Sequence, residues 1–413
     1  MGAKSSTPKT EHIQKYRPPR RGSEKCINQV QTDVSMQITQ HVALTEGKDA
    51  NMVLCPLLIQ LVLSLIALGS NGPTREQMLW FLRSKSVSEL HLHSWDLTRL
   101  TFSDGCAAGG PKLSFVNSVW VDESIYLKQT FKRVLDRVYR ARFEQVDFKT
   151  KAGEFGRKVN SWVENNTNGL IKELLSPDSV DANTRLIFAN ALYFKGTWFS
   201  KFDHSRTSDS DFHLLHGGSV TVPFMTTNSD QYISSFAGFK VLRLCYEKGS
   251  DSRQFSMYIV LPDAKDGLPS LLQKVCSQPK FLESHMPKVH VPVKKFMIPR
   301  FKIAFVLDAS RSLKQLGVTQ PFLNPDLSEM LEPQVGQQLC VSRIFHKAVI
   351  EVNEDGTEAA AASASIFMLK SIDYQDNRLD FVADHPFMFL VREDVSASVL
   401  FIGHVMNPLQ TAA

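Results

Sequence analysis

The chain has 413 residues, of which 43% are hydrophobic and 22% are charged. This balance is that of a globular protein with a large core, and it excludes a fibrous or fully disordered chain. The formal net charge of +5 comes from the first 25 residues, which hold seven Lys or Arg and two Glu. Of the 47 basic and 42 acidic residues, 40 of each remain in the rest of the chain, so its neutrality argues against a nucleic-acid partner.

The first 27 residues are rich in Pro, Lys and Arg, and they predict a disordered basic tail. They lack the apolar stretch of a signal peptide, so we expect an intracellular protein of the cytoplasm or nucleus, with extracellular action left open. The opening MGAKSS matches the pattern for N-myristoylation, which would place an acyl chain on Gly2 and bring the protein to membranes. A single acyl chain binds weakly, so the basic stretch 15–21 would supply a second signal. The alternatives are a solvated tail without lipid or a basic nuclear address.

A helical region follows the tail. Residues 53–69 form one long apolar run that is too short for a membrane span, and we expect a buried core helix there. The Asn-Gly-Pro sequence at residues 71–73 should end this helix. Thr74 with Gln77 then predicts a capping box at the start of the next helix.

Metal and catalytic motifs are absent from the sequence. The six cysteines form no CxxC pair and no zinc-finger spacing, which is typical of reduced and mostly buried thiols. His91 and His93 are two residues apart, a spacing that suits one face of a strand, and they fit a satisfied or exposed pair better than a metal site. There is no GxSxG, HExxH, Walker A or GxGxxG motif. We therefore expect no metal, no cofactor and no enzymatic activity.

The second half of the chain changes to strand-like patterns. A strand at residues 112–121 and a helix at 154–175, which Gly169 could break, precede this change. Residues 213–225 predict a hairpin that turns at Gly217-Gly218. Further strands are predicted at residues 185–198, 253–263, 296–305, 348–352, 385–393 and 399–408. Because the helices come first and the strands later, the order predicts an α+β fold.

A tract of small residues, NEDGTEAAAASASIFMLKS, covers residues 353–371 and follows a predicted strand. As a strand, its alternate residues would share one uncharged face: Thr357, Ala359, Ala361, Ser363, Ser365 and Phe367. The charges of Glu358 and Lys370 would both lie on the other face. Such a segment could enter an existing sheet without burying a charge, and Gly356 would let the backbone swing. The alternative is an exposed alanine-rich helix capped near Asp355.

Several stretches resemble motifs of the serpin family, in the order in which the family carries them. EVNEDGTEAAAASAS (351–365) resembles the hinge of the mobile reactive-centre loop of inhibitory serpins, and FHKAVIEVNEDG (345–356) resembles the strand that leads into it. NALYFKGTWFSKF (190–202) resembles the family's strand and breach motif. FVADHPFMFLVRED (381–394) with VLFIGHVMNP (399–408) resembles the C-terminal signature. These matches span nearly the whole chain. The spacing of the motifs and the sequence VADHPF (382–387) most resemble those of plant serpins.

This resemblance implies one serpin domain over residues 28–413, with three β-sheets, eight or nine helices and an exposed reactive-centre loop at about 354–380. In a serpin, the target protease cleaves the loop and forms an acyl-enzyme. The target is a serine protease or, as a second class, a papain-like cysteine protease. The cut loop then enters the main sheet and distorts the protease before hydrolysis is complete. The resemblance therefore implies a monomeric suicide-substrate inhibitor whose partner is its target protease.

The family spacing, seventeen residues counted from Glu354, implies that the cleaved bond joins Lys370 to Ser371. Lys370 suits proteases with an acidic specificity pocket, because a buried cation needs a partner charge. Adjacent subsites of the protease would receive Phe367, Met368 and Leu369. The same resemblance assigns these residues to the hinge of the loop: Glu354, Asp355, Gly356, Thr357, Glu358, Ala359, Ala360, Ala361 and Ala362.

One departure from the family pattern concerns the shutter under the main sheet. Serpins carry Phe-Ser-Pro-x-Ser-Ile at the start of the second helix, whereas Cys55 and Leu58 replace the two serines here. The shutter positions Asn190 and His346 are kept, as is the breach residue Trp198. We expect the loss of two hydroxyls to weaken a buried polar network by about 1–3 kcal/mol for each unsatisfied partner. The second hypothesis is therefore a non-inhibitory serpin that acts as a binding protein or as a protease substrate.

Overall fold

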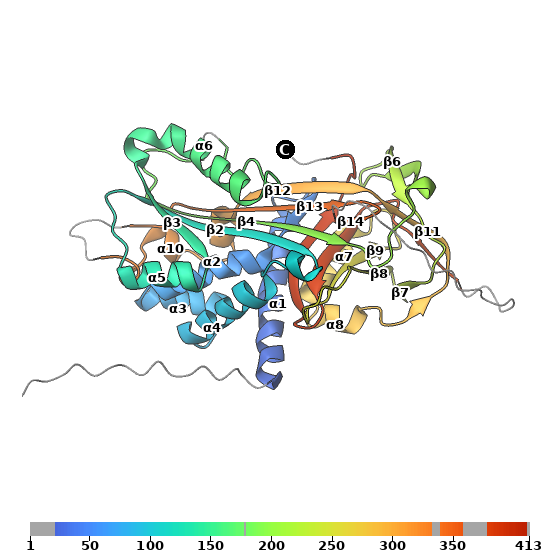
Figure 1. The fold of residues 1–413 in the computed structure, drawn as a ribbon, viewed down its shortest axis with the longest axis horizontal. Helices are drawn as coiled ribbons and strands as arrows, with labels where there is room; N and C mark the ends of the chain where they lie inside the picture. The colour runs from blue at the N-terminus through green and yellow to red at the C-terminus, as the bar shows by residue number, and fades with distance from the viewer. Residues whose placement is uncertain (1–20, 177–178, 333–338, 358–377, 411–413) are drawn as a thin grey trace, which may run out of the picture.

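The computed structural model describes residues 21–176, 179–332, 339–357 and 378–410 (Figure 1). The strands form three sheets and the helices pack around them, which confirms the predicted α+β class. The α-helices of the described residues are α1 (Arg21–Leu44), α2 (Pro56–Gly69), α3 (Gly72–Phe81), α4 (Val87–Asp96), α5 (Gln129–Arg137), α6 (Phe148–Asn166), α7 (Leu268–Ser277), α8 (Phe281–His285), α9 (Ala309–Gln315) and α10 (Gln320–Leu323). These are ten, and α8 and α10 are single turns of five and four residues beyond the eight or nine expected.

The main sheet has six strands and carries the functional region. Its order is β12 (Phe301–Asp308), β13 (Arg343–Val352), β4 (Leu186–Thr197), β2 (Lys112–Asp122) and β3 (Ala141–Val146), and β14 (Gly356–Thr357) pairs with β4 off this path. The two central strands β13 and β4 are parallel, with His346 opposite Asn190. Both neighbouring pairs, β12 with β13 and β4 with β2, are antiparallel. The parallel pair is thus the place where an antiparallel strand could be added.

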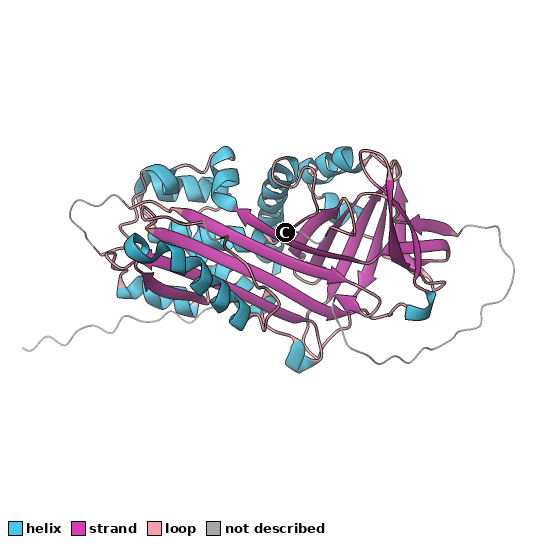
Figure 2. Cartoon of the chain, turned by 90° about the horizontal axis from the view of Figure 1, so that it is seen from above, coloured by secondary structure: helices cyan, strands magenta, loops and turns pink. Residues whose placement is uncertain are grey.

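Two further sheets complete the fold at the other end of the molecule (Figure 2). One has seven strands, in the order β1 (Met52–Leu54), β17 (Ser398–Val405), β16 (Phe387–Glu393), β9 (Phe255–Pro262), β8 (Phe239–Cys245), β7 (Gln231–Phe236) and β10 (His290–Val291). The other has four, in the order β15 (Leu379–Val382), β11 (Val293–Pro299), β6 (Ser219–Met225) and β5 (Ser208–His213). The predicted hairpin is confirmed, since β5 and β6 pair across a turn in which Gly217 and Gly218 have φ of 95° and 81°.

Helices cover both faces of the main sheet (Figure 1). The apolar run predicted as a core helix is α2, in which every residue except Leu68 is buried. On the opposite face lies α6, whose Phe155 meets Trp120 of β2 edge to face at 5.4 Å. These aromatic side chains belong to a second core between α6 and the sheet. None of the described helices is long and apolar enough to cross a membrane.

Several local expectations differ from the structure at helix ends. The capping box is wrong: α3 begins at Gly72, and the Oγ1 of Thr74 accepts a hydrogen bond from the distant amide of Asp326. Gln77 likewise uses its Oε1 to accept hydrogen bonds from the amides of residues 319 and 320. Both side chains therefore form hydrogen bonds with residues far away in the sequence. A local sequence motif such as the capping box cannot predict these bonds.

Other elements begin or end at residues that differ from the predicted ones, and local contacts explain the differences. The helix predicted at 154–175 is α6, which starts earlier because Asp147 caps it by accepting from the amide of Thr150. It ends at Asn166, and Gly169 lies just beyond with φ of 78°. His91 and His93 lie on α4 and not on a strand, so their spacing does not place them on one face. At the N-terminus α1 already begins at Arg21, inside the stretch assigned to the tail, and Gly2 lies outside the described residues.

Candidate functional site

The hinge of the proposed loop is a tight turn at the end of β13. The amide of Asn353 donates to the carbonyl oxygen of Gly356 at 2.9 Å, and the amide of Gly356 donates to the carbonyl oxygen of Asn353 at 3.3 Å. Gly356 has φ of 148°, and a Cβ on it would lie 2.0 Å from the carbonyl oxygen of Gly196. Only glycine fits this position. After the turn, Gly356 pairs with Thr197 and Thr357 with Gly196 of β4, antiparallel, so the loop already starts as a strand of the main sheet.

Aromatic side chains hold the start of this strand. Thr357 is fully buried, and its hydroxyl bonds with the hydroxyl of Tyr246 at 2.8 Å. Burial raises the pKa of Tyr246, so its hydroxyl stays protonated. The ring of Trp198 stacks on Tyr246 at 4.5 Å, and its Nε1 donates to the carbonyl oxygen of Asn353 at 2.9 Å. Thr357 was expected to face the core only after insertion, but it is buried there already.

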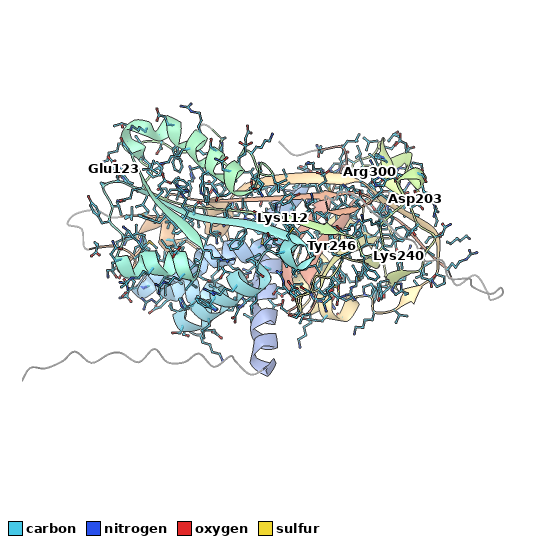
Figure 3. All side chains as sticks on the ribbon, viewed as in Figure 1. Lys112, Glu123, Asp203, Lys240, Tyr246 and Arg300 are labelled. Carbon is cyan, nitrogen blue, oxygen red and sulfur yellow. The ribbon has the colours of Figure 1, made fainter. Side chains whose placement is uncertain are left out.

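Basic residues surround the two acidic residues of the hinge. Glu354 is 1% exposed and accepts hydrogen bonds from Thr207 and from Arg300, whose Nε lies 2.7 Å from Oε1 (Figure 3 labels Arg300). Asp355 pairs with Lys201 and His204, each at 3.2 Å. These side chains, Lys201, His204, Thr207 and Arg300 with the two acidic residues, are called the hinge latch below.

The hinge latch fixes the charge of Glu354. Burial alone would raise the pKa of this carboxyl, but the hydrogen bonds from Thr207 and Arg300 outweigh it and lower the pKa below the ordinary 4.5. A depressed folded-state pKa means that the contribution to stability is complete above about pH 4.5 and is lost as the pH falls through the folded-state pKa. We therefore expect the contribution of Glu354 to stability to decrease in acid.

We expect Glu354→Gln to remove part of the acid sensitivity of folding. Between pH 5 and pH 3 the melting temperature of the wild type should fall more steeply than that of Glu354→Gln, because only the wild type loses a charged partner of Arg300. Glu351→Gln is the matched control, since Glu351 lies on β13 just before the hinge and pairs with Lys302 outside the hinge latch. Parallel pH profiles of wild type and Glu354→Gln would contradict this role.

The shutter lies under the centre of the main sheet. His346 and Asn190 face each other on β13 and β4, both fully buried, and the Nδ1 of His346 donates to the Oδ1 of Asn190. The amide of Cys55 donates to the Nε2 of His346 at 3.0 Å, and the Nδ2 of Asn190 donates to the carbonyl oxygen of Leu58 at 3.4 Å. Because Nε2 accepts a hydrogen bond, the imidazole is neutral, and burial lowers its pKa to about 3.

The expectation that the altered shutter leaves unsatisfied partners is wrong. Neither Asn190 nor His346 has a buried polar atom without a hydrogen bond, because backbone groups at the start of α2 supply the missing partners. The side chains of Cys55 and Leu58 are fully buried in the core. Burial raises the pKa of the Cys55 thiol to about 12, so it is protonated and behaves as a small apolar group.

Restoring serine at both positions should therefore destabilise the protein. Leu58→Ser removes a fully buried side chain, and we expect the free energy of unfolding of Cys55→Ser/Leu58→Ser to fall by about 2–4 kcal/mol. Denaturant unfolding of the single and double variants measures this loss. An unchanged or higher stability of the double variant would show that the hydroxyls contribute more than the lost packing.

The remaining predicted site residues lie outside the described residues. These are Glu358, Ala359, Ala360, Ala361, Ala362, Phe367, Met368, Leu369, Lys370 and Ser371. The described chain stops at Thr357 in the main sheet and resumes at Arg378, next to β15, which pairs in parallel with β11 of the four-stranded sheet. The two ends of the proposed loop are thus anchored in different sheets.

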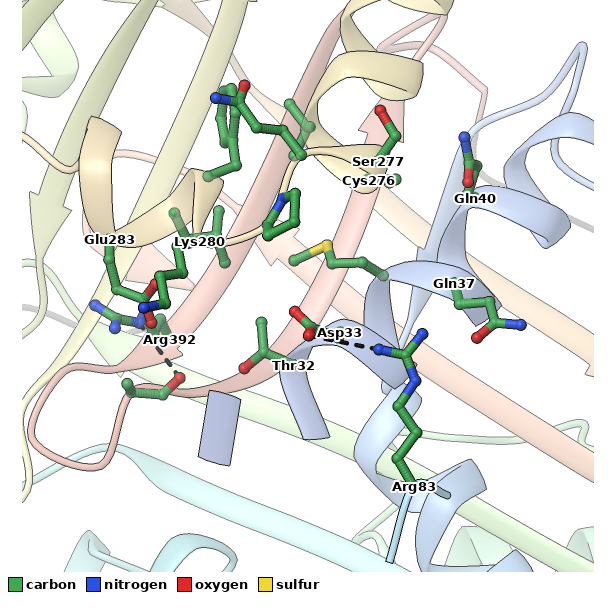
Figure 4. Close-up of a pocket in the computed structure, with 17 residues that line it drawn as sticks. Thr32, Asp33, Gln37, Gln40, Arg83, Cys276, Ser277, Lys280, Glu283 and Arg392 are labelled. Carbon is green, nitrogen blue, oxygen red and sulfur yellow. Dashed lines mark hydrogen bonds and ion pairs between the residues drawn. The ribbon is translucent and has the colours of Figure 1, made fainter. Parts of the chain in front are cut away.

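Metal binding and thiol chemistry are the two other kinds of site considered in the described part of the chain. Its His, Cys, Asp and Glu side chains form no group of three or more that could hold a metal. A hollow of about 260 Å³ lies between α1, α7 and α8 (Figure 4), with Asp33 and Arg83 paired at 3.5 Å on its wall. Its thiol, Cys276, is protonated at neutral pH because burial raises its pKa to about 12. It therefore has no activated nucleophile.

The sheets and the two-residue strand at the hinge define a protein in which the chain turns back after β13 and pairs with β4 of its own main sheet. The family model described as "Serpin (serine protease inhibitor)" matches residues 29–408, and the chain belongs to the serpin family. It is 51% identical over 382 residues to Serpin-ZX of Arabidopsis thaliana, covering 92% of this chain and 98% of that relative. Serpin-ZXA of Oryza sativa subsp. japonica is 50% identical over 368 residues, covering 89% and 92%. Serpins are typically protease inhibitors and not enzymes.

A solved structure carries the same fold. The native stressed conformation of Arabidopsis AtSerpin1 superposes with a TM-score of 0.86 at 49% identity, covering 94% of this chain and 99% of that chain. The plant-type resemblance seen in the sequence is thus confirmed, together with the fold of three sheets.

Proposed function

We propose that this serpin is a suicide-substrate inhibitor of serine endopeptidases, with papain-like cysteine endopeptidases as a second class of target. The observation that carries this proposal is the pairing of Gly356 and Thr357 with β4. The first residues of the loop already form an antiparallel strand. If the following residues extended this strand, the sequence would place no charge on the face of Thr357 as far as Phe367. A cleaved loop would therefore extend a strand that has already begun.

The loop would enter the main sheet between β13 and β4, which would have to separate. Their parallel pairing runs from Arg343 opposite Ile187 to Val349 opposite Tyr193. An antiparallel strand inserted between them would hydrogen-bond to both neighbours and replace a parallel ladder by two antiparallel ones. About a dozen added residues, at roughly 0.5–1.5 kcal/mol per hydrogen bond, would release on the order of 10 kcal/mol. That free energy would drive the distortion of a bound protease.

The chemistry of trapping begins as ordinary proteolysis. The protease nucleophile would attack the carbonyl carbon of Lys370, an ester or thioester to the protease would form, and the peptide bond to Ser371 would break. The amino group of Ser371 would leave with a proton from the general acid of the protease. Insertion before water attacks the new bond would preserve the acyl-enzyme. Nothing in this sequence of steps requires a catalytic group of the serpin.

Mixing with trypsin tests this function directly. Denaturing electrophoresis should show a covalent complex whose mass is close to the sum of the protease and the serpin without its released C-terminal peptide. Mass spectrometry of that peptide should find Ser371 at its N-terminus. Cleavage without any complex would identify a substrate or a non-inhibitory serpin, and would overturn the proposal for trypsin-like targets.

A further inference from the structure

A large hollow lies under α6, against the outer face of the main sheet. It has a volume of about 660 Å³, within the range of small-molecule sites. Its walls come from α6, from the connection that follows α6, and from β12 and β13. The side chains and backbone used in the argument belong to Gly153, Gly156, Leu174, Leu175, Phe345 and Lys347.

Two glycines of α6 keep this hollow open. Gly153 and Gly156 are three residues apart on the helix, so they share one face, and both line the hollow. A Cβ on Gly153 would meet nothing within 4 Å, and one on Gly156 would make only an ordinary contact at 3.7 Å with the carbonyl oxygen of Ser176. Packing therefore does not require glycine at either position, although each costs the helix about 1 kcal/mol relative to alanine. Their shared effect is the empty space beside them.

A buried lysine lies on the sheet side of the hollow. Lys347 of β13 is 7% exposed, and its Nζ donates to the carbonyl oxygen of Glu173 in the connection after α6. Burial lowers the pKa of Lys347, an effect that the charge of Glu173 opposes in part. A buried ammonium with one backbone acceptor still has two N–H donors, and no described carboxylate forms an ion pair with Lys347. The carboxylate of Asp308, also on the wall, is paired with Arg343 at 3.3 Å.

We propose that the hollow under α6 is a binding site for a small amphipathic carboxylate, with Lys347 as its anion contact. The carboxylate would accept hydrogen bonds from the free donors of Lys347, and Arg157, an exposed cation on the wall, would add to the attraction. The apolar part of the ligand would lie against the glycine face of α6 and against Leu174, Leu175 and Phe345, which are all buried. A small anion without an apolar part would leave most of the hollow unfilled.

The position of the site links it to insertion, and this step rests on the proposed function. Asn160 of α6 holds the connection by three hydrogen bonds of 2.8–2.9 Å to the backbone of Leu174 and Leu175. Lys347 ties β13 to the same connection, and α6 packs on β2 through Phe155 and Trp120. A ligand between Lys347 and α6 would therefore strengthen the connection between β13 and the helix above the sheet. This connection would oppose the separation of β13 from β4 that insertion requires. It should stabilise the uncleaved protein and increase the share of protease that cleaves without being trapped.

Calorimetric titration of the full-length, uncleaved protein with octanoate tests the site. Octanamide has the same chain length and no charge, so it is the matched ligand control. We expect saturable 1:1 binding of octanoate, at least 10-fold weaker binding of octanamide, and a rise in melting temperature with octanoate alone. Because no protease is present, this result is independent of whether the protein inhibits one. Equal binding of the two ligands, or no binding of octanoate, would overturn the proposal.

Three variants locate the bound ligand. Lys347→Met removes the charge, and Gly156→Leu fills the hollow, so each should weaken octanoate binding at least 10-fold. Lys172→Met removes an exposed cation from the same connection, next to the wall but not part of it, and should bind like the wild type. The melting temperature of each variant without ligand shows that it is folded. Undiminished binding to folded Lys347→Met, or to folded Gly156→Leu, would place octanoate elsewhere and refute the site.

Discussion

Lys370→Glu should reduce the rate at which the protein traps trypsin by about 10²–10³-fold. The specificity pocket of trypsin-like enzymes carries a carboxylate, so the variant would replace an attractive charge pair by a repulsive one. A like-charge juxtaposition costs several kcal/mol, and each 1.4 kcal/mol corresponds to a factor of ten. The second-order rate constant of complex formation, measured under excess of inhibitor, gives the effect directly.

Lys370→Arg is the matched control for this experiment. Arginine keeps the positive charge, so its rate of complex formation should stay within about 10-fold of the wild type. Thermal unfolding of both variants should match the wild type, since the substitutions change an exposed bait residue according to the proposal. Undiminished trapping by Lys370→Glu would show that the protease cuts another bond.

The hinge illustrates what the sequence could predict. A small-residue tract with one uncharged alternate face, following a strand and a glycine, already suggests a segment that can enter a sheet. The structure adds the reason for Gly356, whose backbone passes too close to Gly196 for any side chain. It also shows that Thr357, the first residue of the uncharged face, points to the core and meets Tyr246. The local pattern indicates the start of this strand, at Gly356 and Thr357, because strand periodicity and glycine geometry are local properties.

The partners of the hinge could not be predicted in the same way. Arg300 and Tyr246 reach the hinge from 54 and 111 positions away along the chain, and such contacts leave no periodic signal. Lys201 lies inside a stretch that resembles the breach motif, yet its pairing with Asp355 depends on how the two segments meet. Contacts of this kind follow from the fold as a whole, and the fold was predicted here from a family resemblance.

The shutter shows a different limit of prediction from the sequence, which concerns backbone hydrogen bonds. The side chains alone predict that the loss of two hydroxyls, at Cys55 and Leu58, leaves unsatisfied partners in the shutter. The amide of Cys55 instead donates to His346, because amides at the start of a helix have no partner within the helix. The carbonyl oxygen of Leu58 accepts a hydrogen bond from Asn190. The altered residues Cys55 and Leu58 then contribute as core side chains. The two missing hydroxyls thus give no reason of their own to prefer a non-inhibitory protein.

Cleavage of the loop should raise the melting temperature by at least about 10 °C. An added strand of about a dozen residues is worth on the order of 10 kcal/mol, and each kcal/mol moves the melting temperature of a large domain by roughly 1–2 °C. Differential scanning calorimetry of the protein before and after limited proteolysis measures the gain. An unchanged melting temperature after clean cleavage would contradict insertion.

A charge on one face of the inserting strand should separate insertion from cleavage. Thr357 is already buried before cleavage, so Thr357→Arg would disturb the uncleaved fold and is a poor test. Ala359 follows on the same face and would reach the core side of the sheet only on insertion. Ala359→Arg should therefore be cleaved without a gain in melting temperature and should form little covalent complex, because a buried unpaired charge opposes insertion. Ala360→Arg is the matched control, because it places the same charge on the face of Glu358, and it should keep most of the gain in melting temperature. Equal gains in melting temperature in the two variants would refute this orientation of the strand.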